Sequence, residues 1–198
     1  MTAKSRVAQN GRLLVGSAFY QAVWFAAVLS AGASSRWWWS AGASAVFLCV
    51  SLCVWPSLRK RVLCLSAAAL ACGLLVDTAM IATGVFASPR MLVPAPLPPL
   101  WLLMLWLSFG TYIALSLEML YGRYWLTAVA GACGGMLAYR GGALFGAIAW
   151  GMPIWLCTLA LMLVWAIVFP LLVSLATWMR NQECRPVLPR RVVRVALM

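Results

Sequence analysis

Long runs of apolar residues alternate along this chain with short breaks that contain charged residues or prolines. A hydrocarbon core about 30 Å thick requires roughly 20 apolar residues in helical conformation, so each run is long enough to cross a bilayer. The pattern therefore predicts an all-α fold, a polytopic transmembrane helix bundle that forms a single domain over residues 1–198. Its six predicted spans cover residues 13–33, 37–56, 62–87, 99–119, 124–149 and 153–178, and a basic tail covers residues 179–198.

The composition favours a membrane protein over a soluble one. Hydrophobic residues make up 65% of the 198 residues and charged residues only 9%, whereas soluble domains are about half apolar and about a quarter charged. The formal net charge of +12 would suggest nucleic acid in a soluble protein. Here the bases flank the apolar runs, and no basic groove with aromatic residues accompanies them. We therefore expect contacts with anionic lipid headgroups and no nucleic-acid partner.

The distribution of the bases predicts the orientation of the chain. Twelve of the fifteen Lys and Arg residues fall in the N-terminal segment, around Arg59, at Arg123 and in the C-terminal tail. The opposite side of the predicted membrane holds the other three, Arg36, Arg90 and Arg140. Because cytoplasmic loops carry the excess of bases, both termini are predicted to be cytoplasmic. Tryptophans near the ends of the predicted spans agree with this orientation, since tryptophan gathers at membrane interfaces.

The first apolar run also resembles a secretory signal peptide. A basic region and an apolar stretch are followed by Ala31-Gly32-Ala33, which has the small residues of a cleavage site. The stretch is longer than a usual signal core and contains Tyr20 and Gln21 in its middle. We therefore interpret it as a retained helix, with cleavage after Ala33 as the alternative.

Cysteine and histidine usage gives no indication of metal or disulfide chemistry. The chain has seven cysteines and no histidine, and no two cysteines have the CxxC spacing of a metal or redox site. We expect no bound metal and no cofactor. Six cysteines fall inside apolar runs, where they are expected to be small buried hydrophobic residues: Cys49, Cys53, Cys64, Cys72, Cys133 and Cys157.

Asp77 is the most informative polar residue, because an ionisable group inside a bilayer is costly unless it faces the protein interior and finds a partner. Gly73 and Gly84 share its helical face and allow another helix to approach closely. We therefore expect the Asp77 carboxylate to accept a hydrogen bond inside the bundle. The candidate donors at matching depth are Tyr139, Gln21 and Tyr20.

Arg140 is a fourth candidate partner for Asp77, at similar depth in the fifth predicted span. In a regular helix Arg140 points about 140 to 160° away from the glycine-rich face of that span, on which Tyr139 lies. Arg140 therefore reaches Asp77 only if Gly141 and Gly142 break the helix. Otherwise its side chain extends outward to lipid phosphate.

Ser108, Thr111 and Glu118 share one face of the fourth predicted span. Hydroxyl side chains commonly form hydrogen bonds between membrane helices, so we favour helix packing over a polar pathway for Ser108 and Thr111. Glu118 lies near the inner surface beside Arg123, where a boundary ion pair would be ordinary.

Several motifs together resemble a known bacterial inner-membrane family. They are Leu75-Val76-Asp77, the run Pro98-Pro99-Leu100-Trp101-Leu102 continuing through Leu105-Trp106 and Phe109, and the glycine segment 131–146 with Tyr139 inside it. The chain resembles the family catalogued as domain of unknown function 2878 over nearly its whole length. The resemblance implies a small multi-pass protein of the bacterial inner membrane without an established activity, and a link to membrane lipid metabolism. The family pattern has a small or apolar residue in place of Arg140, which argues against a general pair with Asp77.

The leading interpretation is a non-catalytic accessory membrane protein that binds lipid or a membrane protein partner. A small transporter or permease is the alternative, and an intramembrane lipid-modifying enzyme that uses Asp77 or Glu118 is the third. No nucleophile lies beside an evident base, so we name no catalytic residue. The candidate binding residues are Asp77, Tyr139, Arg140, Tyr20, Gln21 and Glu118.

Overall fold

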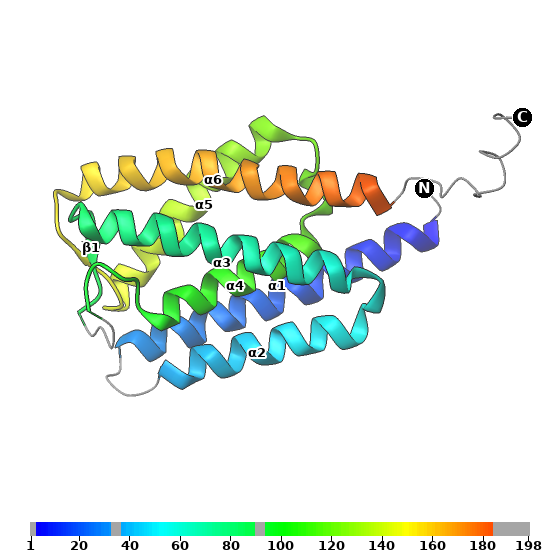
Figure 1. Ribbon diagram of the computed structural model, residues 1–198, viewed down its shortest axis with the longest axis horizontal. Helices are drawn as coiled ribbons and strands as arrows, with labels where there is room; N and C mark the ends of the chain where they lie inside the picture. Colours follow the sequence, from blue (N-terminus) through cyan, green and yellow to red (C-terminus); the bar gives the residue numbers. More distant parts are fainter. Residues whose placement is uncertain (1–2, 33–36, 90–93, 184–198) are drawn as a thin grey trace, which may run out of the picture.

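The computed structural model describes residues 3–32, 37–89 and 94–183, which form a bundle of long helices (Figure 1). Within these ranges the secondary structure is almost entirely helical, as the sequence predicts. The helices are α1 (Ala3–Gly32), α2 (Trp37–Val54), α3 (Arg59–Ala82), α4 (Leu100–Ser116), α5 (Tyr124–Leu144) and α6 (Ile154–Glu183). Two 3-10 helices, η1 (Pro56–Leu58) and η2 (Glu118–Leu120), and two short strands, β1 (Phe86–Ala87) and β2 (Ala149–Trp150), complete the described elements.

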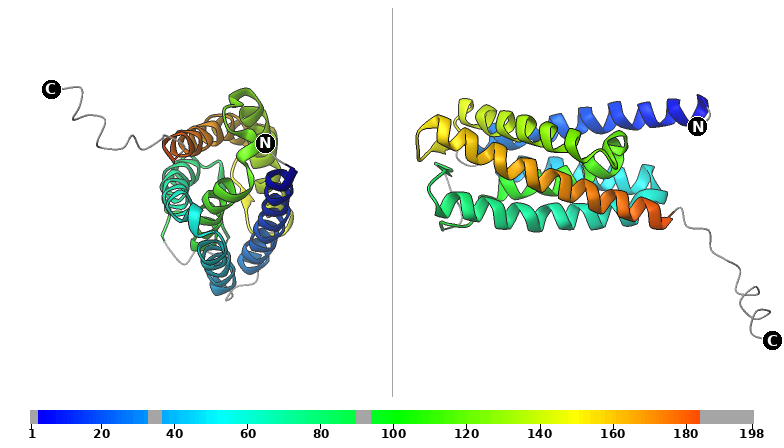
Figure 2. Two further views of the ribbon diagram at one scale, coloured as in Figure 1. Left: turned by 90° about the vertical axis from the view of Figure 1, so that its right-hand side faces the viewer. Right: turned by 90° about the horizontal axis from the view of Figure 1, so that it is seen from above.

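Helix α4 is the centre of the bundle. It packs against α1, α2 and α3 and touches α6 (Figure 2). Twelve of its seventeen residues are buried. A Cβ on Gly110 would lie 2.3 Å from the backbone oxygen of Leu65, so this glycine lets α3 and α4 approach backbone to backbone. The Thr111 and Ser66 hydroxyls are 2.9 Å apart across the same contact, which is the packing role expected for Thr111. Ser108 is also buried, but its hydroxyl has no partner among the described residues.

Helices α5 and α6 form a second layer. This layer contacts the rest of the bundle mainly where α6 packs against α3. A Cβ on Gly131 would lie 2.4 Å from the Trp165 carbonyl oxygen, and one on Gly135 would lie 2.1 Å from Cγ of Trp165. The glycine-rich face of α5 is therefore the face that receives α6, as its small residues predict.

The third and fifth helices end earlier than the sequence predicts. Helix α3 stops at Ala82 rather than residue 87, and α5 stops at Leu144 rather than residue 149. Gly84 and Gly146 follow these ends with φ of 74°, a conformation that favours glycine. The chain then forms antiparallel β1 and β2, with Phe86 opposite Trp150. We call this end of the bundle the strand end, and the opposite end, which holds Arg12, Arg61 and Arg180, the basic end.

The outer surface of the bundle carries large exposed apolar side chains on α1, α2, α3, α5 and α6. Examples are Leu75 on α3, Leu137 on α5 and Leu171 on α6, which are 72%, 62% and 61% exposed. Three stretches are long and apolar enough to cross a membrane, Gln9–Ala31, Pro56–Ala82 and Ile154–Glu183, and Trp38–Val54 and Leu100–Ser116 are shorter apolar helices. These features are those of a membrane protein. Six complete spans and the orientation stay predictions.

Four of the six cysteines expected to be buried point outward instead. Cys49, Cys53, Cys64 and Cys133 are exposed on the bundle surface and Cys72 is partly buried. Cys157 alone among the described cysteines is buried, and its thiol donates to the Val85 carbonyl at 3.1 Å. The expectation was wrong because a thiol is apolar enough to face lipid as well as protein. The segments around Ala33, Arg36 and Arg90 and the tail from residue 184 lie outside the described residues.

Candidate functional site

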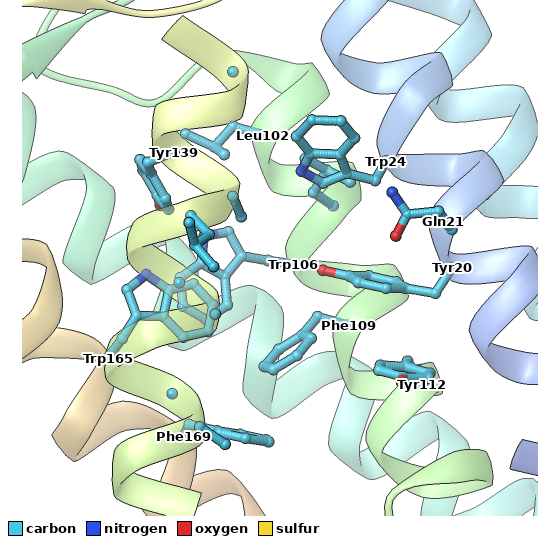
Figure 3. A pocket seen from close by; sticks show the side chains of 18 of the residues that line it. Tyr20, Gln21, Trp24, Leu102, Trp106, Phe109, Tyr112, Tyr139, Trp165 and Phe169 are labelled. Carbon is cyan, nitrogen blue, oxygen red and sulfur yellow. The ribbon is translucent and has the colours of Figure 1, made fainter. Parts of the chain in front are cut away.

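A cavity of about 510 Å³ lies between α1, α4, α5 and α6 (Figure 3). We call it the side cavity, because it reaches the flank of the bundle between α1 and α5. Gln21 on α1 and Gly134 and Leu137 on α5 line it and are exposed. Helix α1 packs on α2 and α4 while α5 packs on α6, so neither helix fills the space between them.

Contacts at both ends of the side cavity connect its two rims. At the strand end, the Trp24 ring lies 6.2 Å from the Phe145 ring and packs over Gly141. At the basic end, Arg12 of α1 binds Glu118 of η2, the element that leads into α5. The opening is therefore a slot along the side of the bundle, joined above and below.

Stacked tryptophans form one wall of the side cavity. The Trp106 and Trp165 rings are 4.7 Å apart between centroids and nearly parallel, at 7°. Each lies over a glycine of a neighbouring helix: a Cβ on Gly73 would be 2.1 Å from Cγ of Trp106, and one on Gly135 equally close to Trp165. Phe109 meets Trp165 edge-on at 5.3 Å. These contacts hold the aromatic surface in one arrangement.

Asp77 fixes this wall from behind. Its carboxylate is fully buried and accepts two hydrogen bonds, from the Trp106 indole at 2.7 Å and from the Tyr139 hydroxyl at 2.5 Å. Asp77 thus faces the interior as predicted, and Tyr139 is one of the predicted donors. Trp106 was not among them, although Gly73 one turn before Asp77 provides the space for its ring. Asp77 itself does not line the cavity, because the two donors separate it from the open space.

Arg140 does not join this group. Its side chain is exposed on the outer surface of α5, which continues unbroken through Gly141 and Gly142 to Leu144. The pair between Asp77 and Arg140 is therefore absent, because an intact helix carries Arg140 away from the face that bears Tyr139. Gly141 instead accommodates Trp24, whose ring would lie 3.0 Å from a Cβ there.

Tyr20 and Gln21 line the side cavity from α1 but do not contact Asp77. Tyr20 stacks on Tyr112 at 4.8 Å with 2° between the ring planes, and the Tyr112 and Ser17 hydroxyls are 3.1 Å apart. Figure 3 shows the Tyr20 hydroxyl directed toward Trp106 and the Gln21 amide beside it. The expectation that either residue donates to Asp77 was wrong, since Trp106 lies between them and the carboxylate.

The lining of the side cavity is mostly apolar and carries no charge. Of the described residues that line it, none is charged. Two of its tryptophans, Trp101 and Trp165, are 5% and 8% exposed and have indole N–H groups with no hydrogen-bond partner in the described structure. The Tyr20 hydroxyl and the Gln21 amide likewise make no hydrogen bond to protein within the described ranges. Sequence reasoning gave no role to Trp101 and Trp165, whose spacing alone resembles ordinary helix packing.

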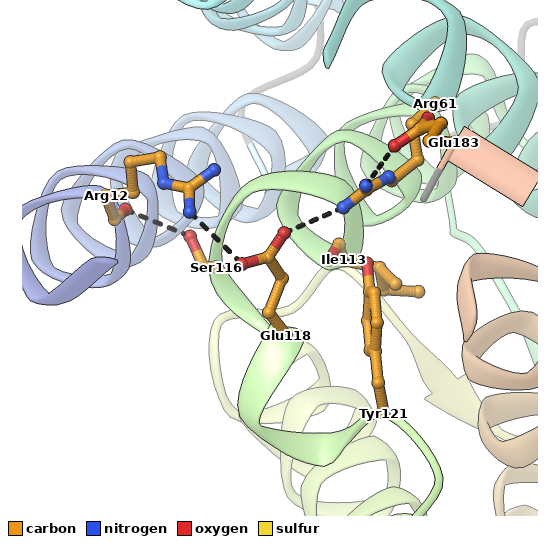
Figure 4. Close-up of polar contacts among 7 residues, drawn as sticks. All are labelled: Arg12, Arg61, Ile113, Ser116, Glu118, Tyr121 and Glu183. Carbon is orange, nitrogen blue, oxygen red and sulfur yellow. Dashed lines mark hydrogen bonds and ion pairs between the residues drawn. The ribbon is translucent and has the colours of Figure 1, made fainter. Parts of the chain in front are cut away.

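A second polar cluster joins four segments at the basic end (Figure 4). Glu118 accepts from Arg12 at 3.1 Å and from Arg61 at 2.7 Å, and Arg61 also pairs with Glu183. Arg61 is only 3% exposed. The predicted neighbour of Glu118, Arg123, is exposed and takes no part, because the turn after η2 directs it outward.

Tyr121 packs beneath this cluster. Arg61 and Arg180 lie over its ring, with guanidinium carbons 6.0 and 5.0 Å from the centroid. Burial raises the pKa of the Tyr121 hydroxyl to about 12, so it stays protonated and donates to the Ile113 carbonyl at 3.1 Å. The cluster therefore anchors η2 to the end of α4 as well as to α1, α3 and α6.

Nothing in these sites suggests a metal centre. Within residues 3–32, 37–89 and 94–183, no group of three or more His, Cys, Asp or Glu side chains is placed to hold an ion. The acidic groups that could serve are already engaged by Arg, Trp or Tyr donors.

Comparison with known proteins identifies the family. A family described as "Protein of unknown function (DUF2878)" matches residues 13–171. The chain belongs to the DUF2878 family. No curated protein and no solved structure matches the chain.

The part of the chain matched to the DUF2878 family contains the whole side cavity. Every residue that lines the cavity falls between Tyr20 and Phe169, inside the matched range. Arg12 and Glu183, the two outer members of the ionic cluster, lie beyond it. The side cavity therefore lies wholly within the part of the chain that the family covers, whereas the ionic cluster lies there only in part.

Proposed function

We propose that this DUF2878 protein is a non-catalytic membrane protein that binds a membrane lipid in its side cavity. The observation that carries the proposal is the cavity's opening between α1 and α5, at Gln21, Gly134 and Leu137, on a flank of the bundle that would face acyl chains in a bilayer. Its volume of about 510 Å³ falls within the 300 to 1,000 Å³ typical of small-molecule sites.

The apolar lining supports a lipid rather than an aqueous solute. Apolar cavities stay dry, so hydrocarbon rather than water would fill a slot that opens into the bilayer core. Transfer of an acyl chain from lipid into this slot gains little hydrophobic free energy, because both environments are apolar. Selectivity would instead come from the fit against the rigid aromatic wall of Trp106 and Trp165.

Transport and catalysis have less support. A transporter site is usually lined by polar groups at helices broken at mid-depth, whereas α5 runs through Gly141 and Gly142 without a break. An enzyme would need a reactive group in the cavity, but both Asp77 oxygens are occupied by Trp106 and Tyr139. Neither is therefore proposed.

The proposal includes a location and an orientation. We place the protein in the bacterial inner membrane with six spans and both termini cytoplasmic, as an accessory component of membrane lipid metabolism. The basic end would then lie at the anionic cytoplasmic headgroups, which favour Arg side chains. Alkaline phosphatase fused at the C-terminus should be inactive, and phosphatase activity there would contradict this orientation.

A photoreactive lipid tests binding in the cavity. The purified protein in nanodiscs is exposed to a phospholipid with a diazirine in mid-chain, and labelled residues are mapped by mass spectrometry. Labelling should concentrate on Gln21, Gly134 and Leu137 relative to Leu75, which is 72% exposed on α3 and does not line the cavity. Uniform labelling around the bundle would contradict a lipid site.

Gly134 offers a substitution that fills the cavity without disturbing the fold. A Cβ at Gly134 meets no atom within 4 Å, so Gly134→Phe projects into open space. Gly42 on α2 is equally unobstructed but does not line the cavity, which makes Gly42→Phe the matched control. Cavity labelling should fall several-fold in Gly134→Phe and stay unchanged in Gly42→Phe.

A further inference from the structure

The side cavity contains hydrogen-bonding groups, and a hydrocarbon chain alone has no polar atom that could pair with them. Tyr20 follows Gln9, the start of its span, by eleven residues, which places it about 17 Å along the helix and near mid-membrane. Gln21 is adjacent, and both line the cavity. At this depth no water competes for the Tyr20 hydroxyl or the Gln21 amide, so an unpaired group is costly.

Both groups can donate a hydrogen bond to an occupant, through the Tyr20 hydroxyl and the Gln21 amide. The Trp101 and Trp165 indoles also lack a partner in the described structure, but their nitrogens are buried away from the open space and do not reach an occupant. Trp106 and Tyr139 also line the cavity, but Asp77 already accepts their protons. The free capacity therefore favours an occupant with acceptor oxygens.

The charge and shape of the lining further limit the class of ligand that could bind. No described residue in the lining is charged, so nothing there would compensate a phosphate or ammonium group. Most of the wall is aromatic. The Trp106 and Trp165 rings stack on each other and lie over Gly73 and Gly135 with their other faces, so they present ring edges to the cavity. Trp24, Phe109 and the stacked Tyr20 and Tyr112 pair line the rest. Aromatic rings of this kind pack edge-to-face or offset against a planar conjugated ring.

We propose that the occupant is an uncharged lipid whose head is a planar ring with carbonyl oxygens, of the quinone class. Tyr20 and Gln21 donate hydrogen bonds to the ring carbonyls, the aromatic wall packs against the ring, and the apolar tail leaves between α1 and α5. This inference rests on the proposed function and specifies its ligand. A phospholipid satisfies it less well, because its polar atoms stay at the bilayer surface and leave Tyr20 and Gln21 unpaired.

Competition in the photolabelling assay tests the ligand class. Nanodiscs that contain the diazirine phospholipid receive either a benzoquinone with a ten-carbon tail or decylbenzene, which has the same tail and no carbonyls. The quinone should halve labelling at Leu137 at a concentration at least tenfold below that of decylbenzene. Equal potency of the two compounds overturns the quinone proposal and leaves lipid binding intact.

Two substitutions locate the recognition. Tyr20→Phe and Gln21→Leu each remove one hydrogen bond, worth about a three- to tenfold loss of quinone potency. Decylbenzene makes no hydrogen bond, so its potency should fall less than that of the quinone in each variant, and thermal unfolding reports that each variant is folded. Unchanged quinone potency in both variants contradicts the proposed contacts. Absence of cavity labelling in the unsubstituted protein would defeat lipid binding and the quinone proposal together.

Discussion

Trp106 donates its indole proton to Asp77 at 2.7 Å while its ring lies directly over Gly73, one helical turn before that carboxylate. A single stretch of α3 thus supplies both the space and the acceptor for the tryptophan. The buried carboxylate accepts hydrogen bonds from Trp106 and Tyr139, and these two side chains line the side cavity. Asp77 is therefore a positioning residue rather than a ligand-binding one.

Asp77→Ala should destabilise the protein more than Asp77→Asn. The alanine leaves the Trp106 indole and the Tyr139 hydroxyl without an acceptor, at about 1 to 3 kcal/mol for each buried donor. The asparagine carbonyl still accepts one bond. Thermal unfolding in nanodiscs measures both variants. Equal losses for the two would mean that the negative charge, and not the acceptor geometry, holds the wall.

Gly73→Ala and Gly135→Ala should each cost about 1 to 3 kcal/mol, because the added methyl group meets a tryptophan ring at 2.1 Å. Gly134→Ala, one residue from Gly135 but facing open space, is the control and should be neutral or slightly stabilising. The measurement is the free energy of unfolding of the purified protein. A loss in Gly134→Ala as large as in Gly135→Ala would show that α5 needs glycine for flexibility instead.

Arg61→Leu should reduce stability by about 1 to 3 kcal/mol, between the values for buried and exposed ion pairs, since Arg61 is buried while Glu183 is partly exposed. Arg123→Leu should have little effect, because Arg123 is exposed and outside the cluster. Thermal unfolding at low and high salt measures the difference. The loss in Arg61→Leu should persist at high salt, and its disappearance there would indicate a weak surface pair.

Cysteine reactivity should follow the outward positions of the thiols. A membrane-permeant maleimide should label Cys64, which is exposed near Arg59 at the basic end, in the folded protein, because the thiolate that reacts forms only near water. Cys157, which is fully buried, should react only after unfolding. Replacement of all seven cysteines by Ala or Ser should leave the protein folded. Mass spectrometry of labelled peptides measures the reactivity, and early labelling of Cys157 would contradict its burial against the Val85 carbonyl.

Sequence patterns predicted the helices well because apolar run length directly limits where a membrane helix can lie. They also included Tyr139 among the candidate donors to Asp77, since both residues lie on small-residue faces at similar depth. They missed Trp106, because a tryptophan 29 residues from Asp77 gives no indication that its indole serves as a donor. They missed the pair of Arg61 and Glu118 for a related reason: 57 residues separate them, and Arg123 was the nearer base.

The strand end of the bundle was the least predictable part of the fold. Residues after Ala82 and Leu144 continue the apolar composition, so hydropathy extends both helices too far. The positive φ of Gly84 and Gly146 and the pairing of Phe86 with Trp150 depend on two segments meeting across the bundle. Local sequence patterns do not predict such a long-range contact.

The slot between α1 and α5 is joined at both ends, by Trp24 with Phe145 and by Arg12 with Glu118. A molecule can therefore enter or leave sideways while both helices keep their positions. Exchange then requires side chains such as Leu137 to rotate, which takes picoseconds to nanoseconds, rather than helices to separate over microseconds to milliseconds. Residence time in the cavity would be set by how tightly the occupant fits, so tighter ligands should differ from weaker ones in their rate of departure and hardly in their rate of arrival.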